Sequence, residues 1–247
     1  MQIPGQVIHQ LSSARRVAAM TGAGVSAESG IPTFRDAQTG LWSKFRAEDL
    51  ATPEAFQRDP ETVWTWYRHR AEQAATVEPN PGHFALAQLE QRVEHFTLIT
   101  QNVDGLHRRA GSQRVLELHG DISRAICHIT RRPVTEKYLV ETAGSPPPSP
   151  HHPAGLCRPD VVWFGEMLPD GVLDQAFEAS QQCDVFLSIG TSSVVEPAAS
   201  LAVAAHRAGA FLIEINPGET PLSSLADAVL AGPSGTVLPR LLQAMDD

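Results

Sequence analysis

The run at residues 20–36, MTGAGVSAESGIPTFRD, constrains the fold more than any other part of the chain. An apolar stretch at residues 17–20 leads into Gly22 and Gly24, and a helix start follows, for which we expect Ser26 as the cap. Because glycine has no Cβ, its backbone can lie against a pyrophosphate, and the free N–H groups of a helix start supply donors. The run therefore predicts a strand, a turn and a helix that form a phosphate site. Taken alone, it is also typical of a tight strand-to-helix turn without a ligand.

The spacing of this turn resembles a dinucleotide fingerprint but continues differently. Gly22, Gly24 and Ala27 fit the glycine/alanine variant of that fingerprint. A dehydrogenase would continue into a second strand that ends in an acidic residue about 20 positions on. This chain instead continues with IPTFRD at residues 31–36 and GLW at residues 40–42. We interpret this as a polar and aromatic loop that folds over a ligand.

Strand-like and helix-like patterns alternate along the chain. Apolar runs predict buried strands at residues 17–20, 96–100, 185–189, 211–215 and, more weakly, 226–230. Helical periodicity lies between them, at residues 60–77, 82–94, 173–180, 197–208 and 237–245. This alternation predicts an α/β fold with a doubly wound parallel, Rossmann-like sheet, whose ligands bind at the carboxyl ends of the strands.

Two insertions interrupt this alternation and predict a smaller lobe. We expect a single domain, residues 1–247, with a large lobe at about 1–31, 91–124 and 157–247. The small lobe then comprises about residues 32–90 and 125–156. Residues 144–150, GSPPPSP, exclude regular structure and predict a mobile or polyproline-like loop.

Charge and cysteine content narrow the class of protein. The net charge of −9 disfavours nucleic acid and anionic membranes as partners. No apolar run approaches the roughly 18 residues of a membrane helix, and the first residues lack a signal-peptide pattern, so we expect a cytoplasmic protein. The three cysteines, Cys127, Cys157 and Cys183, are widely spaced and odd in number, which predicts reduced thiols instead of a disulfide framework.

Further polar residues follow other predicted strands. Residues 101–107, QNVDGLH, come directly after the strand that ends at Thr100 and offer side chains to a ribose or an amide, although Asp104 and Gly105 are also typical of a plain turn. His119, followed by Gly120, ends another apolar stretch. Imidazole titrates near neutral pH and suits a general base, the alternative being a structural histidine.

These motifs, with three later ones, resemble the signature of the sirtuins, the NAD-dependent protein-lysine deacylases. The later ones are RPDVVWFGE at residues 158–166, GTS at residues 190–192 with Val195, and NPG at residues 216–218. The resemblance spans roughly residues 17–235 and implies that NAD is consumed as a co-substrate. The implied NAD-binding residues are Gly22, Ala23, Gly24, Ala27, Thr33, Phe34, Arg35, Trp42, Gln101, Asn102, Val103, Asp104, Gly190, Thr191, Ser192, Asn216, Pro217, Gly218 and Ser234.

The resemblance also implies the catalytic and peptide-binding residues. His119 and Asn102 would be catalytic, with His119 as the base that takes a proton from a ribose hydroxyl. Val162, Trp163 and Phe164 would bind the substrate peptide by strand addition and wall the acyl-lysine tunnel. The implied products are nicotinamide, O-acyl-ADP-ribose and free lysine.

The helix at residues 60–77 bears on the acyl group. Its spacing places Val63, Tyr67, Arg70 and Ala74 on one face, so an arginine lies beside a tyrosine on an apolar stripe. Such an arginine can simply pack its stem and pair its head with a surface carboxylate. However, Tyr67 and Arg70 resemble the pair that recognises the acyl carboxylate in one sirtuin class, the bacterial desuccinylase and demalonylase type, and Ala51 resembles the small residue that widens that pocket. A planar guanidinium suits carboxylate binding, so we expect succinyl- or malonyl-lysine as substrate, with acetyl-lysine second.

The chain departs from the sirtuins at their structural zinc site, which uses two Cys-x-x-Cys pairs. Cys127 matches the first position, but Thr130 replaces the second cysteine, the other pair is absent, and Cys157 stands too close to the RPD motif. Tetrahedral zinc needs four good ligands, which Cys127, His128, His151 and His152 offer only at irregular spacing. We therefore expect no metal.

Two other functions share the same nucleotide site. One is mono-ADP-ribosyl transfer to a protein, against which His119 argues, because that chemistry does not need the base in the same way. The other is a non-catalytic NAD sensor, which the joint presence of Phe34, Asn102, Asp104 and His119 disfavours. The expected partners are acyl-lysine proteins or peptides, with an acylated small molecule as the alternative. The sequence names neither the physiological substrate nor an oligomeric state.

Overall fold

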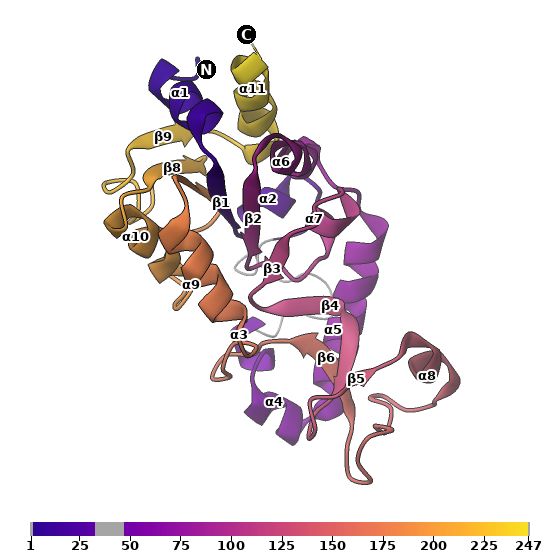
Figure 1. Ribbon diagram of the computed structural model, residues 1–247. Coiled ribbons are helices and arrows are strands. Elements are labelled where there is room, and N and C mark those ends of the chain that lie inside the picture. Colours follow the sequence, from indigo (N-terminus) through magenta and orange to yellow (C-terminus); the bar gives the residue numbers. More distant parts are fainter. Residues whose placement is uncertain (1, 33–46, 247) are drawn as a thin grey trace.

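The structure is a computed structural model that describes residues 2–32 and 47–246 (Figure 1). Its main sheet has six strands in the order β3-β2-β1-β7-β8-β9, and every neighbouring pair is parallel. The strands are β1 (Arg16–Thr21), β2 (His95–Thr100), β3 (Val115–Glu117), β7 (Val185–Ile189), β8 (Phe211–Asn216) and β9 (Ala228–Ala231). The predicted doubly wound parallel sheet is confirmed. The strand order reverses between β1 and β7, and in such sheets ligands bind at the carboxyl ends of strands at this switch point.

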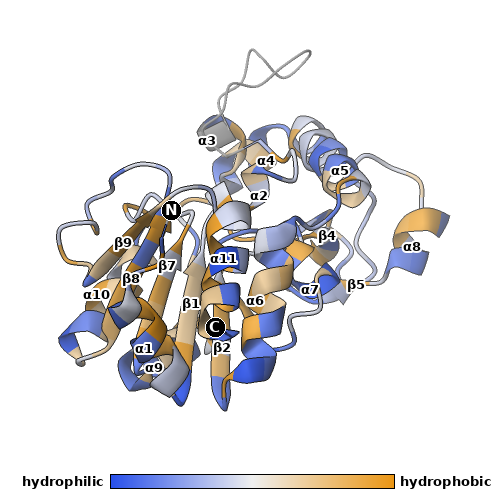
Figure 2. Ribbon diagram, turned by 90° about the horizontal axis from the view of Figure 1, so that it is seen from above, coloured by the Kyte–Doolittle hydropathy of each residue, from blue (hydrophilic) through white to orange (hydrophobic). Residues whose placement is uncertain are grey.

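Helices cover both faces of this sheet because its central strands are apolar on both faces. Val17 and Ala19 of β1 face α1 (Gly5–Ser13), α6 (Pro81–Arg92) and α11 (Ser234–Asp246), within one core. Ala18 and Met20 face α9 (Val172–Gln182) and α10 (Ala199–Arg207), within a second core. In Figure 2 the strands are mainly hydrophobic, and blue hydrophilic segments lie on these helices.

A smaller lobe lies beside the carboxyl ends of β2 and β3 (Figure 1). It holds an antiparallel sheet in the order β5-β4-β6, and its elements are α3 (Ala47–Leu50), α4 (Pro53–Arg58), α5 (Pro60–Thr76), β4 (Gly120–Cys127), β5 (Pro133–Val134), α8 (Glu136–Glu141) and β6 (Cys157–Val161). Thr52 and Asp59 cap α4 and α5 by accepting from the Ala55 and Thr62 N–H groups, each at 3.1 Å. These caps fix where the two helices begin.

The position of α6 differs from the expected lobe boundary. We expected residues up to about 90 in the small lobe, but Ala85, Leu86 and Leu89 lie in the core of the main sheet, against α11. We therefore propose that the boundary lies between α5 and α6.

Two local expectations also need correction. Ser26 is not the cap of α2 (Gly24–Ala27), since Ala23 occupies that position and the Ser26 hydroxyl donates to Asp104 instead. The irregular loop at residues 144–150 packs against its neighbours, with Pro146, Pro147 and Ser149 buried. Cys157 N–H donates to the Pro147 carbonyl at 2.8 Å. Within the part of the chain that the structure describes, none of the helices combines the length and apolarity of a membrane span.

Candidate nucleotide and acyl-lysine site

The glycine turn after β1 packs directly on the end of β7. Gly22 N–H donates to the Ile189 carbonyl at 3.0 Å, and Gly24 N–H donates to the Gly190 carbonyl at 2.9 Å. A Cβ on Gly24 would lie 2.7 Å from the Gly190 carbonyl oxygen, which is too close for any side chain. Gly190 itself has a φ of +58°, a conformation that favours glycine. Glycine is therefore required here to bring β1 and β7 together at the switch point, whatever it also does for a ligand.

The segment after β2 is tied to the same turn by side chains. The Asn102 amide donates to the Gly22 carbonyl and to the Ser26 hydroxyl, both at 3.1 Å. Ser26 in turn donates to Asp104 Oδ2 at 2.7 Å, and Leu106 N–H donates to the other Asp104 oxygen at 3.0 Å. Burial raises the pKa of the Asp104 carboxyl, an effect that these hydrogen bonds partly oppose. Two predicted site segments are thus joined by direct hydrogen bonds.

Most of the remaining predicted dinucleotide residues that the structure describes follow the ends of β1, β2, β7 and β8. The Gln101 amide donates to the Thr191 hydroxyl at 3.1 Å, and the Asn216 amide donates to the Thr191 carbonyl at 3.3 Å. Ser234 opens α11, where the Glu28 carboxylate accepts from Gly235 N–H at 2.7 Å. Ala23 and Ala27 lie at the two ends of α2, Val103 lies between Asn102 and Asp104, Ser192 follows β7, and Pro217 and Gly218 follow β8. Thr33, Phe34, Arg35 and Trp42 lie outside the described residues.

This donor set fits a dinucleotide. Amides, hydroxyls and a carboxylate surround the glycine turn, and these are the groups that hydrogen-bond ribose hydroxyls, a carboxamide and phosphate oxygens. Gly218 borders open space among the described residues, since a Cβ there would meet nothing within 4 Å.

His119 lies in the turn between β3 and β4. Its Nδ1 is 3.0 Å from the Gln101 carbonyl oxygen. A carbonyl only accepts, so Nδ1 carries the proton and Nε2 keeps a lone pair. Burial lowers the pKa of this imidazole, although the hydrogen bond to Gln101 opposes the effect. The neutral ring is thus in the tautomer that a general base requires.

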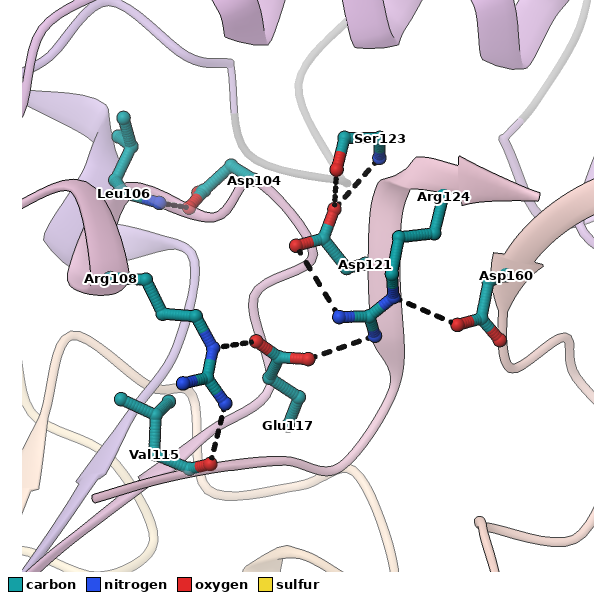
Figure 3. A network of polar contacts seen from close by, with 9 residues as sticks. All are labelled: Asp104, Leu106, Arg108, Val115, Glu117, Asp121, Ser123, Arg124 and Asp160. Atoms are coloured by element: carbon teal, nitrogen blue, oxygen red, sulfur yellow. Dashed lines mark hydrogen bonds and ion pairs between the residues drawn. The ribbon is translucent and has the colours of Figure 1, made fainter. Parts of the chain in front are cut away.

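Charged residues that sequence reasoning missed hold this turn in place (Figure 3). Glu117 accepts from Arg108 at 2.6 Å and from Arg124 at 2.9 Å. Arg124 also pairs with Asp160 of β6 at 3.0 Å. The network links α7 (Leu106–Arg109), β3, β4 and β6. His119 lies in the turn between two of these elements, β3 and β4. Arg124 and Asp160 lie 36 residues apart, so no local pattern indicated their pairing. Glu117 lies nine residues from Arg108 and seven from Arg124, which is outside the spacing of a local helical pair.

Gly120 after His119 has a specific structural role. Its φ is +81°, and a Cβ there would lie 2.1 Å from the Asp160 carbonyl oxygen. Only glycine therefore lets β4 begin against β6 directly after the histidine. The sequence showed His119 followed by Gly120, but only the structure shows why position 120 requires glycine.

The predicted peptide-binding residues lie next to His119. Val162 N–H donates to the His119 carbonyl, and Phe164 N–H donates to the Ala51 carbonyl, both at 2.9 Å. The buried Trp163 ring contacts Phe56 and Tyr67, with centroid distances of 5.3 and 6.2 Å. The structure thus brings together the predicted base, the predicted strand and the small residue at position 51.

Arg158 and Glu166 fix the orientation of Trp163, and neither was predicted as a site residue. The Arg158 Cζ lies 3.3 Å from the centroid of the Trp163 ring. Glu166 accepts two hydrogen bonds from Arg158, at 2.7 and 2.9 Å, and one from Trp163 N–H at 2.9 Å. Burial acts to raise the pKa of the Glu166 carboxyl, but the hydrogen bonds from Arg158 and Trp163 leave it lowered. Both residues stand in the RPDVVWFGE motif, which was the available signal.

Arg70 lies one helical turn after the buried Tyr67 on α5. Its Cζ lies 5.0 Å from the centroid of the Trp66 ring. Burial lowers the pKa of the guanidinium and raises that of the Tyr67 phenol. Among the side chains that the structure describes, no carboxylate pairs with Arg70. The alternative that a surface carboxylate neutralises this arginine has no support in the described region.

The region expected to lack zinc shows no alternative cluster. Across residues 2–32 and 47–246, no group of three or more histidine, cysteine, aspartate or glutamate side chains is arranged to hold a metal. Leu156 N–H donates to His128 Nδ1 at 2.8 Å, and His151 Nε2 lies 2.8 Å from the Pro133 carbonyl. These nitrogens have backbone partners. The absence of zinc stays a prediction.

An open parallel sheet with convergent polar groups at its switch point and a neutral imidazole beside them defines a nucleotide-binding α/β enzyme. Residues 22–197 match the model of the Sir2 family. The chain belongs to this family.

Similar proteins agree with this assignment. An NAD-dependent protein deacylase of Thermus thermophilus is 50% identical over 221 residues, covering 88% of this chain and 85% of the relative. The crystal structure of a Sir2 homologue in complex with NAD has a TM-score of 0.91 and 44% identity, covering 99% of this chain and 94% of that one. A structure of Sir2 bound to an acetylated peptide has a TM-score of 0.88 and 29% identity, covering 98% of each chain.

Proposed function

We propose that this protein is an NAD-dependent protein-lysine deacylase that prefers succinyl- or malonyl-lysine and accepts acetyl-lysine as a second substrate. The products are nicotinamide, O-acyl-ADP-ribose and free lysine. The observation that carries the proposal is the His119 imidazole, whose pKa is lowered by burial, whose tautomer is fixed by the Gln101 carbonyl, and which adjoins the Val162 backbone. Membership of the Sir2 family and the deacylase names of its relatives support it.

NAD, when bound, supplies the ADP-ribosyl group that accepts the acyl group. The turn at Gly22, Ala23 and Gly24 with Ala27 would hold its pyrophosphate. Phe34 would shield the reacting ribose, and Thr33, Arg35 and Trp42 would also contact NAD. Gln101, Asn102, Val103 and Asp104 would bind the nicotinamide side, and Gly190, Thr191, Ser192, Asn216, Pro217, Gly218 and Ser234 the remainder. The donor groups described above and the NAD complex of a 44% identical Sir2 homologue support this assignment.

The chain's own residues then provide orientation and proton transfer. His119 Nε2 takes a proton from a ribose hydroxyl, since Nδ1 is engaged with Gln101. Asn102 is oriented by Gly22 and Ser26, so its amide has a fixed direction at the reacting centre. Trp163, packed between Arg158 and Tyr67, helps to exclude water from the acyl group.

The proposed preference for an acidic acyl group rests on Arg70 and Tyr67 of α5. Arg70 has no carboxylate partner among the described side chains, and it follows the buried Tyr67 phenol by one turn. A carboxylate at the end of a succinyl or malonyl chain would supply the missing counter-charge, with Tyr67 as a hydrogen-bond donor. Ala51 leaves room for the longer chain.

The proposed substrates are acyl-lysine proteins or peptides, bound by strand addition at Val162, Trp163 and Phe164. The hydrogen bonds from Val162 N–H to the His119 carbonyl and from Phe164 N–H to the Ala51 carbonyl support this location, because they hold the segment next to the proposed base. We also propose that the small lobe folds without zinc. A cytoplasmic location stays a prediction from the sequence.

One assay distinguishes the candidate functions. Purified protein is incubated with NAD and matched succinyl, malonyl and acetyl peptides, and all species are followed by mass spectrometry. O-acyl-ADP-ribose formed fastest from the succinyl or malonyl peptide supports the proposal. A heavier protein acceptor without acyl loss would support ADP-ribosyl transfer, and NAD binding without any product would support a sensor.

A further inference from the structure

Two of the three cysteines lie directly opposite each other in the small sheet. Cys127 is the last residue of β4, Cys157 is the first residue of β6, and the two are Cα partners in the antiparallel register. Both side chains are buried. Cys183, the third thiol, lies outside the small lobe, in the core of the main sheet under α9 and α10.

The backbone hydrogen bonds show which kind of cross-strand pair this is. Cys127 N–H donates to the Arg132 carbonyl and Cys157 N–H to the Pro147 carbonyl, so neither bonds the other. His128 N–H donates to the Leu156 carbonyl at 3.0 Å, the contact that flanks a non-hydrogen-bonded pair. In such pairs the Cα atoms are about 4.5 Å apart and both side chains point to the same face. This lies at the short end of the Cα range that a disulfide accepts, roughly 4.4–6.8 Å.

The two thiols differ in pKa, and Cys127 affects the pKa of Cys157. Burial raises the pKa of Cys157 to about 11, and the neighbouring Cys127 adds to the rise. Burial also acts to raise the pKa of Cys127, but hydrogen bonds from Ser149, Thr130 and Ile129 outweigh it and bring the value to about 7. The pair therefore combines a nucleophilic thiol with a resolving thiol at the adjacent position.

The loop segment around Gly155 packs over Cys127. A Cβ on Gly155 would lie 3.1 Å from Cys127 Sγ, so the sulfur lies directly beneath a residue without a side chain. The neighbouring Pro153 and Ala154 are exposed. Gly155 is itself buried, so access of a small oxidant to Cys127 requires this segment of the loop to move.

We propose that Cys127 and Cys157 form a reversible disulfide that links β4 to β6 when a hydroperoxide oxidises them. The Cys127 thiolate attacks the peroxide oxygen, the O–O bond breaks, and water or an alcohol leaves after taking up a proton. Cys157 then attacks the sulfenic sulfur of Cys127, the S–O bond breaks, and a second water leaves with the Cys157 proton. Both thiols are oxidised and the hydroperoxide is reduced.

The link would close the segment that carries β5, α8 and the loop at residues 144–155. Closing a loop of this length restricts the unfolded chain, so the oxidised protein should be the more stable form. His119 and Trp163 lie at the opposite ends of β4 and β6, so we expect the link to change stability more than catalysis. The proposal does not depend on the proposed function, because its readouts are mass and melting temperature.

The test uses the full chain, reduced, desalted and treated with hydrogen peroxide. Thiols are then alkylated in denaturant, and the protein is digested with trypsin and a glutamate-specific protease, which cuts at Glu166 and so separates Cys157 from Cys183. We expect the loss of two hydrogen atoms from the intact mass, a Cys127–Cys157 linked peptide, and alkylated Cys183. The melting temperature should rise by about 5 °C or more and return after dithiothreitol.

Two variants make the result decisive. Cys183→Ala should behave as the wild type, whereas Cys157→Val should form no link and show no rise in melting temperature. Sulfinic acid on Cys127 without a link, links only between chains, an unchanged melting temperature, or a zinc ion on the purified protein that protects Cys127 would each overturn the proposal.

Discussion

His119 Nδ1 lies 3.0 Å from the carbonyl oxygen of Gln101. Gln101 directly follows β2, a central strand of the main sheet, whereas His119 lies in the turn that enters the small lobe. The contact therefore fixes the ring of the proposed base to the element that also carries Asn102 and Asp104. The same contact decides the tautomer, because the carbonyl needs a donor.

Replacing this imidazole should remove catalysis and spare NAD binding. We expect His119→Ala to lower the rate of O-acyl-ADP-ribose formation by about 10²–10⁴-fold, the usual contribution of a general base. The stabilisation of the protein by NAD, measured as a shift in melting temperature, should stay close to that of the wild type. His95→Ala, at an exposed histidine on β2, is the matched control. Full activity in His119→Ala would remove this residue from the mechanism.

The pH profile should report the lowered pKa of His119. Burial moves this pKa below its ordinary value of 6.5, and the base works in the neutral form. The rate should therefore fall as the pH drops through the folded pKa, and it should be independent of this group above pH 6.5. The measurement is kcat/KM for the acyl peptide against pH. An acid limb with a midpoint above the ordinary histidine value would contradict the assignment.

The glycine turn should be intolerant of any side chain for a structural reason. A Cβ on Gly24 would meet the Gly190 carbonyl oxygen at 2.7 Å, and because this oxygen belongs to the backbone it cannot turn aside as a side chain could. We expect Gly24→Ala to lower the free energy of unfolding by about 1–3 kcal/mol, as overpacking does, and to weaken NAD binding. Gly5→Ala, where a Cβ meets nothing within 4 Å, serves as the control in urea unfolding. Equal stability of the two variants would show that the turn relaxes freely.

The buried ion pair of Arg158 and Glu166 should stabilise the fold far more than the exposed ion pair of Arg131 and Glu166. Glu166 also pairs with Arg131 at 3.1 Å, but the Arg131 side chain is 46% exposed and that of Arg158 only 3%. Glu166→Gln leaves a buried guanidinium without counter-charge, which typically costs about 3–5 kcal/mol, whereas Arg131→Gln should cost about 0–1 kcal/mol. Chemical unfolding measures both. Because Glu166 also accepts from Trp163 N–H, its variant should raise the KM for acyl peptide as well.

Long apolar runs predicted the main sheet well because each such strand is buried on both faces. The edge strand β3 of the main sheet and the strands of the small lobe escaped prediction for a physical reason. β3 and β5 contain three and two residues, too few for any periodicity, and β4 and β6 carry charged residues, among them Arg124 and Asp160, which pair across the sheet. The expected cap at Ser26 failed similarly, since Asp104, 78 residues away, takes its hydroxyl hydrogen bond. A local sequence pattern gives no information on hydrogen-bond partners that lie so far away along the chain.

The candidate site was predicted by resemblance more than by pattern. Polar residues after β1, β2, β7 and β8 meet because parallel strands end at one edge of a sheet, which the sequence implied. The contacts that hold these residues in place could not be predicted from the sequence. Glu117 holds Arg108 and Arg124 together, and Gly120 is needed only because the Asp160 carbonyl lies against it. These requirements arise from contacts between different secondary-structure elements, which a local sequence pattern does not show.

The acyl preference gives the sharpest test of the substrate pocket. Arg70 on α5 has no described carboxylate partner and lies against Trp66, so it can serve an acidic acyl chain. We expect Arg70→Met to lower kcat/KM for a succinyl peptide by about 10–100-fold, since a hydrogen bond to a charged group contributes about 1.5–3 kcal/mol. Activity on the matched acetyl peptide should change little, because that substrate has no carboxylate.

Arg68→Met, at an exposed position of the same helix, controls for the loss of a positive charge on α5. It should leave both activities as in the wild type. If Arg70→Met kept the succinyl preference, the carboxylate role would be wrong. If it lowered both activities equally, Arg70 would act through the packing of Trp66 instead, because only direct recognition separates the two substrates.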